Sequence, residues 1–430
     1  QKYIAAVKGA CAGGGYELAL ACNHIILTND STSSVALPEV PLLAVLPGTG
    51  GLTRVTDKRK VRRDRADVFC SIEEGVRGQR AVDWQLVDEI AANSTFDETV
   101  QARAREFATQ LKKPSDLQGI ALKPLDRTIS EDGSVTYSTV EVTLNRTEGR
   151  VGITINGPTE AAPADVETLH SQGSDAYILR LARELDDAIL HLRMNEREAG
   201  LIEFRTQGDP ALFLEHEALL INNSDHWLAN EILAYWKRVL KRIDVTSRSL
   251  VALVEHGSCF AGILAELLWA SDRSYMMLDE FEGDNRPLAA VTLSPINFGA
   301  LPMANDLTRL QTRFLGDQDQ IERAHETVGD PLDADAADEL GLITYAFDDI
   351  DWEDEVRLFL EERGSFSPDA VTAMEANLRF AGPETMETRI FGRLTAWQNW
   401  VFQRPNAVGT DGALQRYGTG KRGNYDMERV

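Results

Sequence analysis

Two glutamates, Glu17 and Glu39, lie in segments that can hold a carboxylate rigidly. Glu17 follows three consecutive glycines, residues 13–15, and begins a stretch rich in Leu and Ala that predicts a helix. Glu39 is flanked by Pro38 and Pro41, whose rings restrict the backbone torsions. Either glutamate alone is typical of a surface, but two carboxylates close together rarely both stay charged. The pair is therefore a candidate general acid and general base.

The residues around Glu17 predict a strand, a glycine turn and a helix. Residues 4–7 form an apolar strand, and the glycines let the chain turn tightly before the helix begins. Backbone N–H groups at a helix N-terminus point toward a negative or polarised oxygen. The glycine spacing matches neither the dinucleotide-binding motif nor the phosphate-binding loop of nucleotide hydrolases.

Composition excludes several other classes of function. The 430 residues carry 44 Lys and Arg against 68 Asp and Glu, a net charge of −24 that argues against nonspecific binding to nucleic acid. Four scattered cysteines predict neither disulfides nor a metal site, and we expect a cytoplasmic protein with no membrane span. One basic run, 58–65, reads either as a solvated helix face or as a subsite for a polyanionic ligand.

Four motifs together resemble the crotonase (enoyl-CoA hydratase/isomerase) superfamily over residues 1–95. They are the strand 4–7, the turn and helix start 13–19, Leu37-Pro38-Glu39, and the Leu-Pro-Gly-rich segment 46–54. The resemblance implies an α/β fold of ββα superhelix type and an acyl-CoA substrate. It also implies no metal and no cofactor apart from the CoA of the substrate.

The resemblance also implies roles for particular residues. Gly14 N–H is expected to be one donor of an oxyanion hole, with the second donor upstream of Gln1. The expected substrate-binding residues are Gly13, Gly15 and Pro38. Glu17 and Glu39 are expected to be catalytic, activating water and moving protons, while Cys11 beside the turn is expected to be core packing.

A second, altered copy of this organisation follows later in the chain. Residues 250–254 predict another apolar strand, 257–267 another turn into a helix, and 301–309 repeats the spacing of 46–54. Glu266 corresponds to Glu17. Bulky Ile263 and Leu264 replace the turn glycines Gly14 and Gly15, and by spacing from 301–309 Ser294 replaces Glu39. We therefore expect the second copy to be structural.

The repeat divides the sequence into four predicted regions. They are the C-terminal part of an active crotonase-like domain at 1–112, a linker at 113–138, a degenerate crotonase-like domain at 139–350 and a helical region at 351–430. Within the second copy we expect strands at 151–155 and 200–204 and a helix at 175–191. Because the chain opens directly on a strand, we expect it to be a fragment whose first domain is truncated.

The doubled architecture narrows the resemblance to ring-opening lyases of aerobic benzoate degradation. Such an enzyme would take the 2,3-epoxide of benzoyl-CoA and water to 3,4-dehydroadipyl-CoA semialdehyde and formate. Two alternatives stay open: an ordinary enoyl-CoA hydratase/isomerase, which would not need the second copy, and a non-catalytic assembly subunit, which would be expected to lose Glu17 or Glu39. We expect a homodimer that binds neither nucleic acid nor membrane.

Overall fold

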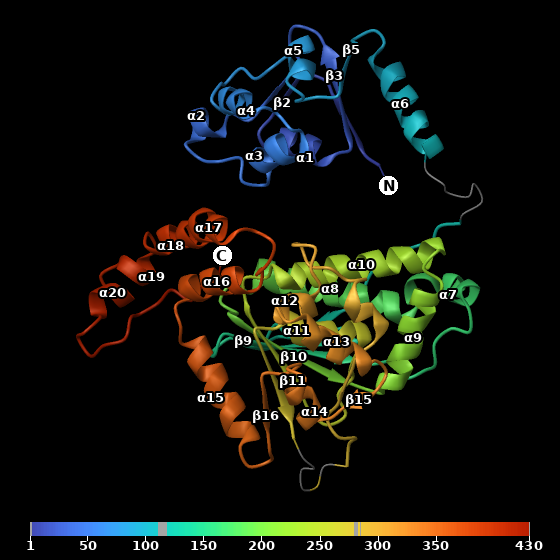
Figure 1. Ribbon diagram of the computed structural model, residues 1–430, viewed down its shortest axis with the longest axis vertical. Helices are drawn as coiled ribbons and strands as arrows, with labels where there is room; N and C mark the ends of the chain where they lie inside the picture. The colour runs from blue at the N-terminus through green and yellow to red at the C-terminus, as the bar shows by residue number, and fades with distance from the viewer. Residues whose placement is uncertain (1, 111–117, 279–282, 284, 430) are drawn as a thin grey trace. The chain divides into compact units, whose positions relative to one another are not determined.

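The computed structural model describes residues 2–110, 118–278, 283 and 285–429. The chain divides into two compact units, Gln1–Gly119 (unit 1) and Ile120–Val430 (unit 2) (Figure 1). Both are α/β, as the sequence predicts. Within the described residues, no helix is long and apolar enough to cross a bilayer.

Unit 1 is built on a parallel sheet of order β1-β3-β5, with β1 Ile4–Val7, β3 His24–Asn29 and β5 Glu89–Ala92. A second parallel pair, β2 Ala10–Ala12 with β4 Ser34–Ala36, leads into the glycine turn. The helical segments are α1 Gly14–Ala21, α2 Glu39–Leu43, α3 Gly51–Thr53, the π-helical turn η1 Arg54–Lys58, α4 Arg63–Cys70, α5 Gly78–Asp83 and α6 Phe96–Gln110.

Unit 2 contains an eight-stranded sheet of order β16-β13-β11-β10-β9-β8-β7-β6. Neighbours from β16 to β9 pair in parallel, and the pairs from β9 to β6 are antiparallel. These strands are β6 Thr128–Ile129, β7 Val135–Thr136, β8 Val140–Asn145, β9 Arg150–Asn156, β10 Leu201–Gln207, β11 Ser249–Val254, β13 Arg273–Met277 and β16 Tyr345–Phe347. A smaller sheet contains β12 Phe260–Ala261, β14 Val291–Thr292 and β15 Pro331–Leu332.

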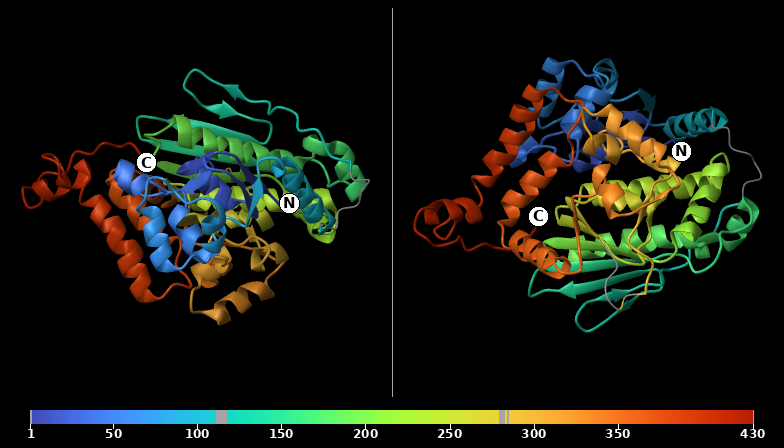
Figure 2. Two further views of the ribbon diagram at one scale, coloured as in Figure 1. Left: turned by 90° about the horizontal axis from the view of Figure 1, so that it is seen from above. Right: turned by 60° about the horizontal axis from the view of Figure 1, so that its bottom comes forward.

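Residues 250–254 of β11 form a continuous apolar run within the larger sheet. Every residue of β11 is buried, as expected for a parallel strand covered on both faces. The amphipathic helices α8 Tyr177–Asn195 and α10 Trp227–Asp244 lie side by side (Figure 2), and Trp236 Nε1 of α10 donates to Ile178 O of α8 at 3.1 Å.

The other helical segments of unit 2 follow in chain order. They are α7 Val166–Gln172, η2 Gly173–Asp175, α9 Pro210–Asn222, η3 Gly262–Ala265, α11 Glu266–Ala270, η4 Pro295–Phe298, α12 Arg309–Arg313, α13 Gln318–Glu326, α14 Ala334–Glu339, α15 Trp352–Gly364, α16 Pro368–Leu378, α17 Met386–Arg389, η5 Ile390–Leu394, α18 Thr395–Val401, α19 Pro405–Val408 and α20 Ala413–Arg416.

The order of elements in unit 1 recurs in unit 2. Strands β1, β2, β3, β4 and β5 correspond to β11, β12, β13, β14 and β16, and α1 corresponds to η3 with α11. Helix α6, after the last strand of unit 1, corresponds to α15, so the predicted helical region 351–430 begins with a helix of the repeat.

The ladder register corrects one predicted correspondence. Ala12 pairs with Ala36 in unit 1, and Ala261 pairs with Thr292 in unit 2. Counting on from these pairs aligns Glu39 with Pro295 and not with Ser294, because one residue fewer separates β14 from the 301–309 segment than separates β4 from the 46–54 segment. The expected absence of a carboxylate at this point of the loop is unaffected.

The predicted linker 113–138 needs a larger correction. Residues 111–117 lie outside the described residues, but β6 and β7 fall within the rest and continue the sheet of unit 2 through β8 (Figure 2). Strands of two residues show no periodicity, so the sequence pattern could not reveal them. Of the other predicted elements, the strands near 151 and 200 and the helix near 175 are present as β9, β10 and α8.

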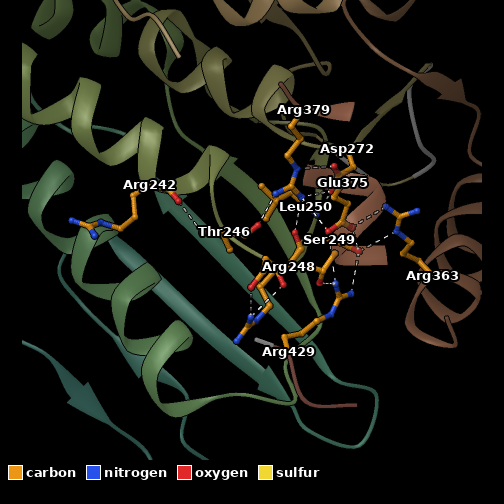
Figure 3. A network of polar contacts seen from close by, with 12 residues as sticks. Arg242, Thr246, Arg248, Ser249, Leu250, Asp272, Arg363, Glu375, Arg379 and Arg429 are labelled. Carbon is orange, nitrogen blue, oxygen red and sulfur yellow. Dashed lines mark hydrogen bonds and ion pairs between the residues drawn. The ribbon is translucent and has the colours of Figure 1, made fainter. Parts of the chain in front are cut away.

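A network of buried polar contacts attaches α15 and α16 to the sheet of unit 2 (Figure 3). Arg379, at the end of α16, donates to both carboxylate oxygens of Asp272 at 2.9 and 2.6 Å. Arg363 of α15 donates to Ser249 Oγ at 3.0 Å and to Glu375 Oε1 at 2.9 Å. Helices α15 and α16 therefore pack as part of the compact body of unit 2.

Candidate active site

The glycine turn of unit 1 leaves backbone amides uncovered. Gly13 caps α1 with φ of 57°, a left-handed conformation that favours glycine, and its N–H donates to Ala36 O at 3.1 Å. Gly14 and Gly15 are exposed, and a Cβ added to either would meet no atom within 4 Å. Because the first N–H groups of a helix have no acceptor inside it, Gly14 N–H is available to a ligand oxygen.

Glu17 lies in the first turn of α1 and is buried. Its Oε1 accepts Gly51 N–H at 2.8 Å, and its Oε2 accepts the Thr49 hydroxyl. A Cβ on Gly51 would lie 2.9 Å from Glu17 Oε1 and 2.8 Å from Pro47 Cβ, so the loop closes on the carboxylate only with glycine there. The segment 46–54 was noted as a motif, but sequence reasoning did not assign Thr49 or Gly51 a role.

Glu39 is the first residue of α2, directly after the half-buried cap residue Pro38. Its side chain is buried, and its Oε1 lies 3.2 Å from the position that a Cβ would take on Gly13. Its Oε2 is buried and has no hydrogen-bond partner among the described residues. Burying a polar atom without a partner is costly, so the structure keeps one oxygen of Glu39 uncommitted beside the glycine turn.

Neighbouring side chains fix this arrangement. Tyr16 is fully buried in α1, and its hydroxyl donates to Leu86 O at 2.7 Å. Val40 and Cys70 line a cavity of 460 Å³ next to α2. Burial, with a smaller contribution from the charge of Glu39, raises the pKa of Cys70 to about 11. Burial also raises the pKa of Cys11, so both thiols are neutral at pH 7.

The basic run 58–65 serves internal contacts in part. Lys58 Nζ donates to Leu20 O at 2.6 Å and Cys22 O at 2.7 Å, which neutralises the carbonyl end of α1. Arg59 Nη1 is 2.9 Å from Asp88 Oδ1. These two cations stabilise unit 1, which weakens the interpretation of the run as a subsite for a polyanion.

The second copy surrounds its glutamate differently. Glu266 is buried; Asn297 Nδ2 donates to its Oε1 at 2.7 Å and Arg309 Nη1 to its Oε2 at 2.8 Å. Arg309 is also buried and pairs with Asp244 at 2.7 Å. The carboxylate corresponding to Glu17 is thus committed to a buried ion pair.

Known proteins resemble this chain over part or all of its length. Residues 2–150 match the family model described as enoyl-CoA hydratase/isomerase. The chain is 51% identical over 429 residues to the benzoyl-CoA-dihydrodiol lyase of Aromatoleum evansii, covering 100% of this chain and 76% of that protein. It is 35% identical over 111 residues to a fatty acid oxidation complex subunit alpha of Shewanella loihica, covering 26% of this chain and 15% of that one.

Among solved structures, an enoyl-CoA hydratase from Geobacillus kaustophilus matches with a TM-score of 0.49 and 16% identity, covering 68% of this chain and 98% of that chain. The similarity to the Aromatoleum protein is the stronger finding, because it extends over the whole of this chain, including both units and the C-terminal helices. The chain belongs to the crotonase superfamily and, within it, to the family of benzoyl-CoA-dihydrodiol lyases.

Proposed function

We propose that the chain is a benzoyl-CoA-dihydrodiol lyase, a carbon–carbon lyase that opens the aromatic-derived ring of an acyl-CoA. The observation that carries the proposal is the 51% identity to the Aromatoleum enzyme over the whole chain. The buried glutamates beside an open glycine turn support it. Both are present in this chain, which a non-catalytic assembly subunit would not require.

The reaction constrains what the site must do. The substrate is 2,3-epoxybenzoyl-CoA, and the products are 3,4-dehydroadipyl-CoA semialdehyde and formate. By atom balance, the epoxide and two water molecules yield these products, so the site must activate water and move protons while one ring carbon leaves. No separate cofactor takes part in this scheme, because CoA belongs to the substrate.

The residues of unit 1 divide these tasks. Gly14 N–H donates to the thioester oxygen, where negative charge develops during ring opening; losing one such donor typically costs a factor of ~10²–10³ in rate. Gly13, Gly15 and Pro38 shape the approach to this donor. Thr49 and Gly51 hold Glu17 in one orientation, and the uncommitted Oε2 of Glu39 takes up or delivers a proton.

The test is formate release from 2,3-epoxybenzoyl-CoA by the full-length protein, by Glu17→Gln and by Glu39→Gln. We expect formate from the parent and a loss of about 10²–10⁴-fold in each variant, the usual contribution of a general acid or base. Cys11→Ser is the matched control: this half-buried neighbour of the turn has a neutral thiol, and its variant should keep parental activity.

Absence of formate, together with hydration of a simple enoyl-CoA, would instead identify an ordinary hydratase.

Two further parts of the proposal concern domain organisation and oligomeric state. Units 1 and 2 are each crotonase-like, as their common order of elements suggests. The enzyme is a homodimer, for which sedimentation equilibrium is the direct measurement.

A further inference from the structure

A buried glutamate outside the proposed site occupies the turn of the second copy. Glu217 belongs to α9, which packs against β12 and η3, and its side chain is 1% exposed. Its Oε2 accepts Ile263 N–H at 2.6 Å, and its Oε1 accepts the Ser294 hydroxyl. The sequence pattern did not single this residue out as part of the repeat.

The strand register identifies the amide that Glu217 binds. With Ala261 in place of Ala12, Gly262 corresponds to Gly13, and Ile263 corresponds to Gly14. The two turn glycines have similar φ angles, 50° and 57°. The N–H that binds Glu217 is therefore the counterpart of the N–H that we assign to the thioester oxygen in unit 1.

Buried side chains also block access to this turn in unit 2. A Cβ at Gly14 or Gly15 would meet open space, whereas Ile263 and Leu264 are fully buried in the core of unit 2. A Cβ at Gly262 would lie 2.1 Å from Glu217 Oε2, so the carboxylate packs directly on the turn. In unit 1, the position that a Cβ would take on Gly13 lies 3.2 Å from Glu39 Oε1, and the next residue, Gly14, is exposed.

We propose that Glu217 is an internal ligand: its carboxylate occupies in unit 2 the position of the substrate oxygen in unit 1. A side chain of the protein itself then occupies the oxygen position in the second copy. One chain therefore binds one acyl-CoA, in unit 1. The identification of this position with the thioester oxygen rests on the proposed function. The occupation of the turn by a carboxylate rests on the contacts of Glu217 alone.

The test replaces the internal carboxylate with a free one. Glu217→Ala is melted in sodium acetate and, as a control for ionic strength, in sodium chloride. We expect acetate to raise the melting temperature of this variant saturably, because it binds the folded state, and to leave the parent unchanged. No effect of acetate beyond that of chloride would overturn the proposal.

A second substitution tests whether acetate binds at the position of the Glu217 carboxylate. Adding Ser294→Ala removes one of the two donors, and acetate binding should weaken by about tenfold or more, as expected for a lost hydrogen bond to a charged group. The matched control is Glu184→Ala, which removes an equally buried carboxylate bound by Thr139 in another part of unit 2. Adding Ser294→Ala should not alter any response of that variant to acetate, and equal weakening in both pairs would contradict the assignment.

If Glu217→Ala does not fold, the number of benzoyl-CoA molecules bound per chain of the parent tests the proposal instead. Calorimetric titration with benzoyl-CoA should give one site per chain, and Glu217→Gln, whose amide can still bind both partners, should give the same number. Two sites in the parent would overturn the proposal. Because the acetate melts require no turnover, their failure is distinguishable from the failure of the lyase assignment, which would show as zero sites or no formate.

Discussion

Glu17 and Glu266 occupy corresponding positions in the two copies of the turn, but the hydrogen-bond partners of their carboxylates differ. Glu17 is held by neutral donors, the Thr49 hydroxyl and Gly51 N–H. Glu266 is bound by Arg309, which also binds Asp244. A carboxylate held by neutral donors can still exchange a proton with a ligand, whereas one in a buried ion pair is fixed by its partner's charge. The difference teaches that the partners of a repeated residue, rather than its presence, decide whether the copy can react.

The surroundings of the two turns differ in the same sense. Leu18 in α1 is 71% exposed, while Leu267 at the corresponding position of α11 is fully buried. Leu46 is 65% exposed, while its counterpart Leu301 is 2% exposed. Within its unit, the second copy has therefore packed the surroundings of its turn into the core, whereas the first keeps them accessible.

The largest expected effect comes from the arginine of the second copy. Arg309→Ala leaves Glu266 and Asp244 buried without their cation, and we expect a loss of about 3–5 kcal/mol in the stability of unit 2. The corresponding Arg54→Ala in unit 1 removes a contact to Thr49 O from a partly exposed side chain and should cost about 1 kcal/mol or less. Urea unfolding measures both; equal losses would show that the two copies do not differ as described.

Glu217→Gln should change how stability depends on pH. Burial is the main cause that raises the pKa of Glu217 to about 7, from an ordinary value of 4.5. The folded state therefore binds an extra proton between these values, and this contribution to stability is lost as pH rises through about 7. By this linkage the parent should lose up to about 3 kcal/mol across pH 4.5–7 that the variant keeps. Parallel pH profiles of unfolding free energy would contradict this expectation.

Much of the first copy could be predicted from its sequence because its signals are local. A strand, a glycine turn and a helix follow one another within residues 4–21, and the structure contains all three. Both predicted glutamates are buried near this turn. Their assignment as catalytic residues stays a prediction, as does that of Gly14.

What could not be predicted depends on contacts between residues far apart in the chain. Glu217 meets Ile263 across a separation of 46 residues and Ser294 across 77, and no spacing rule relates such positions. Pairing Glu39 with Ser294 by counting was wrong because the loop of the second copy is one residue shorter than that of the first, which only the ladder hydrogen bonds reveal. The strands β6 and β7 were missed because two residues carry too little pattern.

Gly13 and Gly262 occupy corresponding positions in the two turns, so the same substitution can be compared at both. Ala at either position must adopt a left-handed backbone, which costs roughly 1–2 kcal/mol. In Gly262→Ala the new Cβ also overlaps the buried carboxylate of Glu217, whereas in Gly13→Ala it meets Glu39 at 3.2 Å. We expect Gly262→Ala to lose about 1–2 kcal/mol more than Gly13→Ala, as overpacking typically costs. Thermal melts of both variants test this order, and the reverse order would mean that Glu217 yields more easily than its burial implies.

The smallest effect concerns the neutral donor that distinguishes Glu17 from Glu266. Thr49 touches no substrate in our proposal and acts as a positioning residue, through its hydroxyl on Glu17 Oε2. Thr49→Ala leaves Glu17 with Gly51 N–H as its remaining donor, and losing one hydrogen bond of about 1.4 kcal/mol should lower kcat about tenfold. KM should change little, because the thioester donor Gly14 is untouched, and Thr49→Ser should restore kcat because it keeps the hydroxyl. A general loss of packing would instead lower stability in both variants and leave the serine variant unrescued. Recovery of kcat in Thr49→Ser, without recovery in Thr49→Val, would show that the hydroxyl on the carboxylate, rather than the volume of the side chain, keeps the first copy reactive.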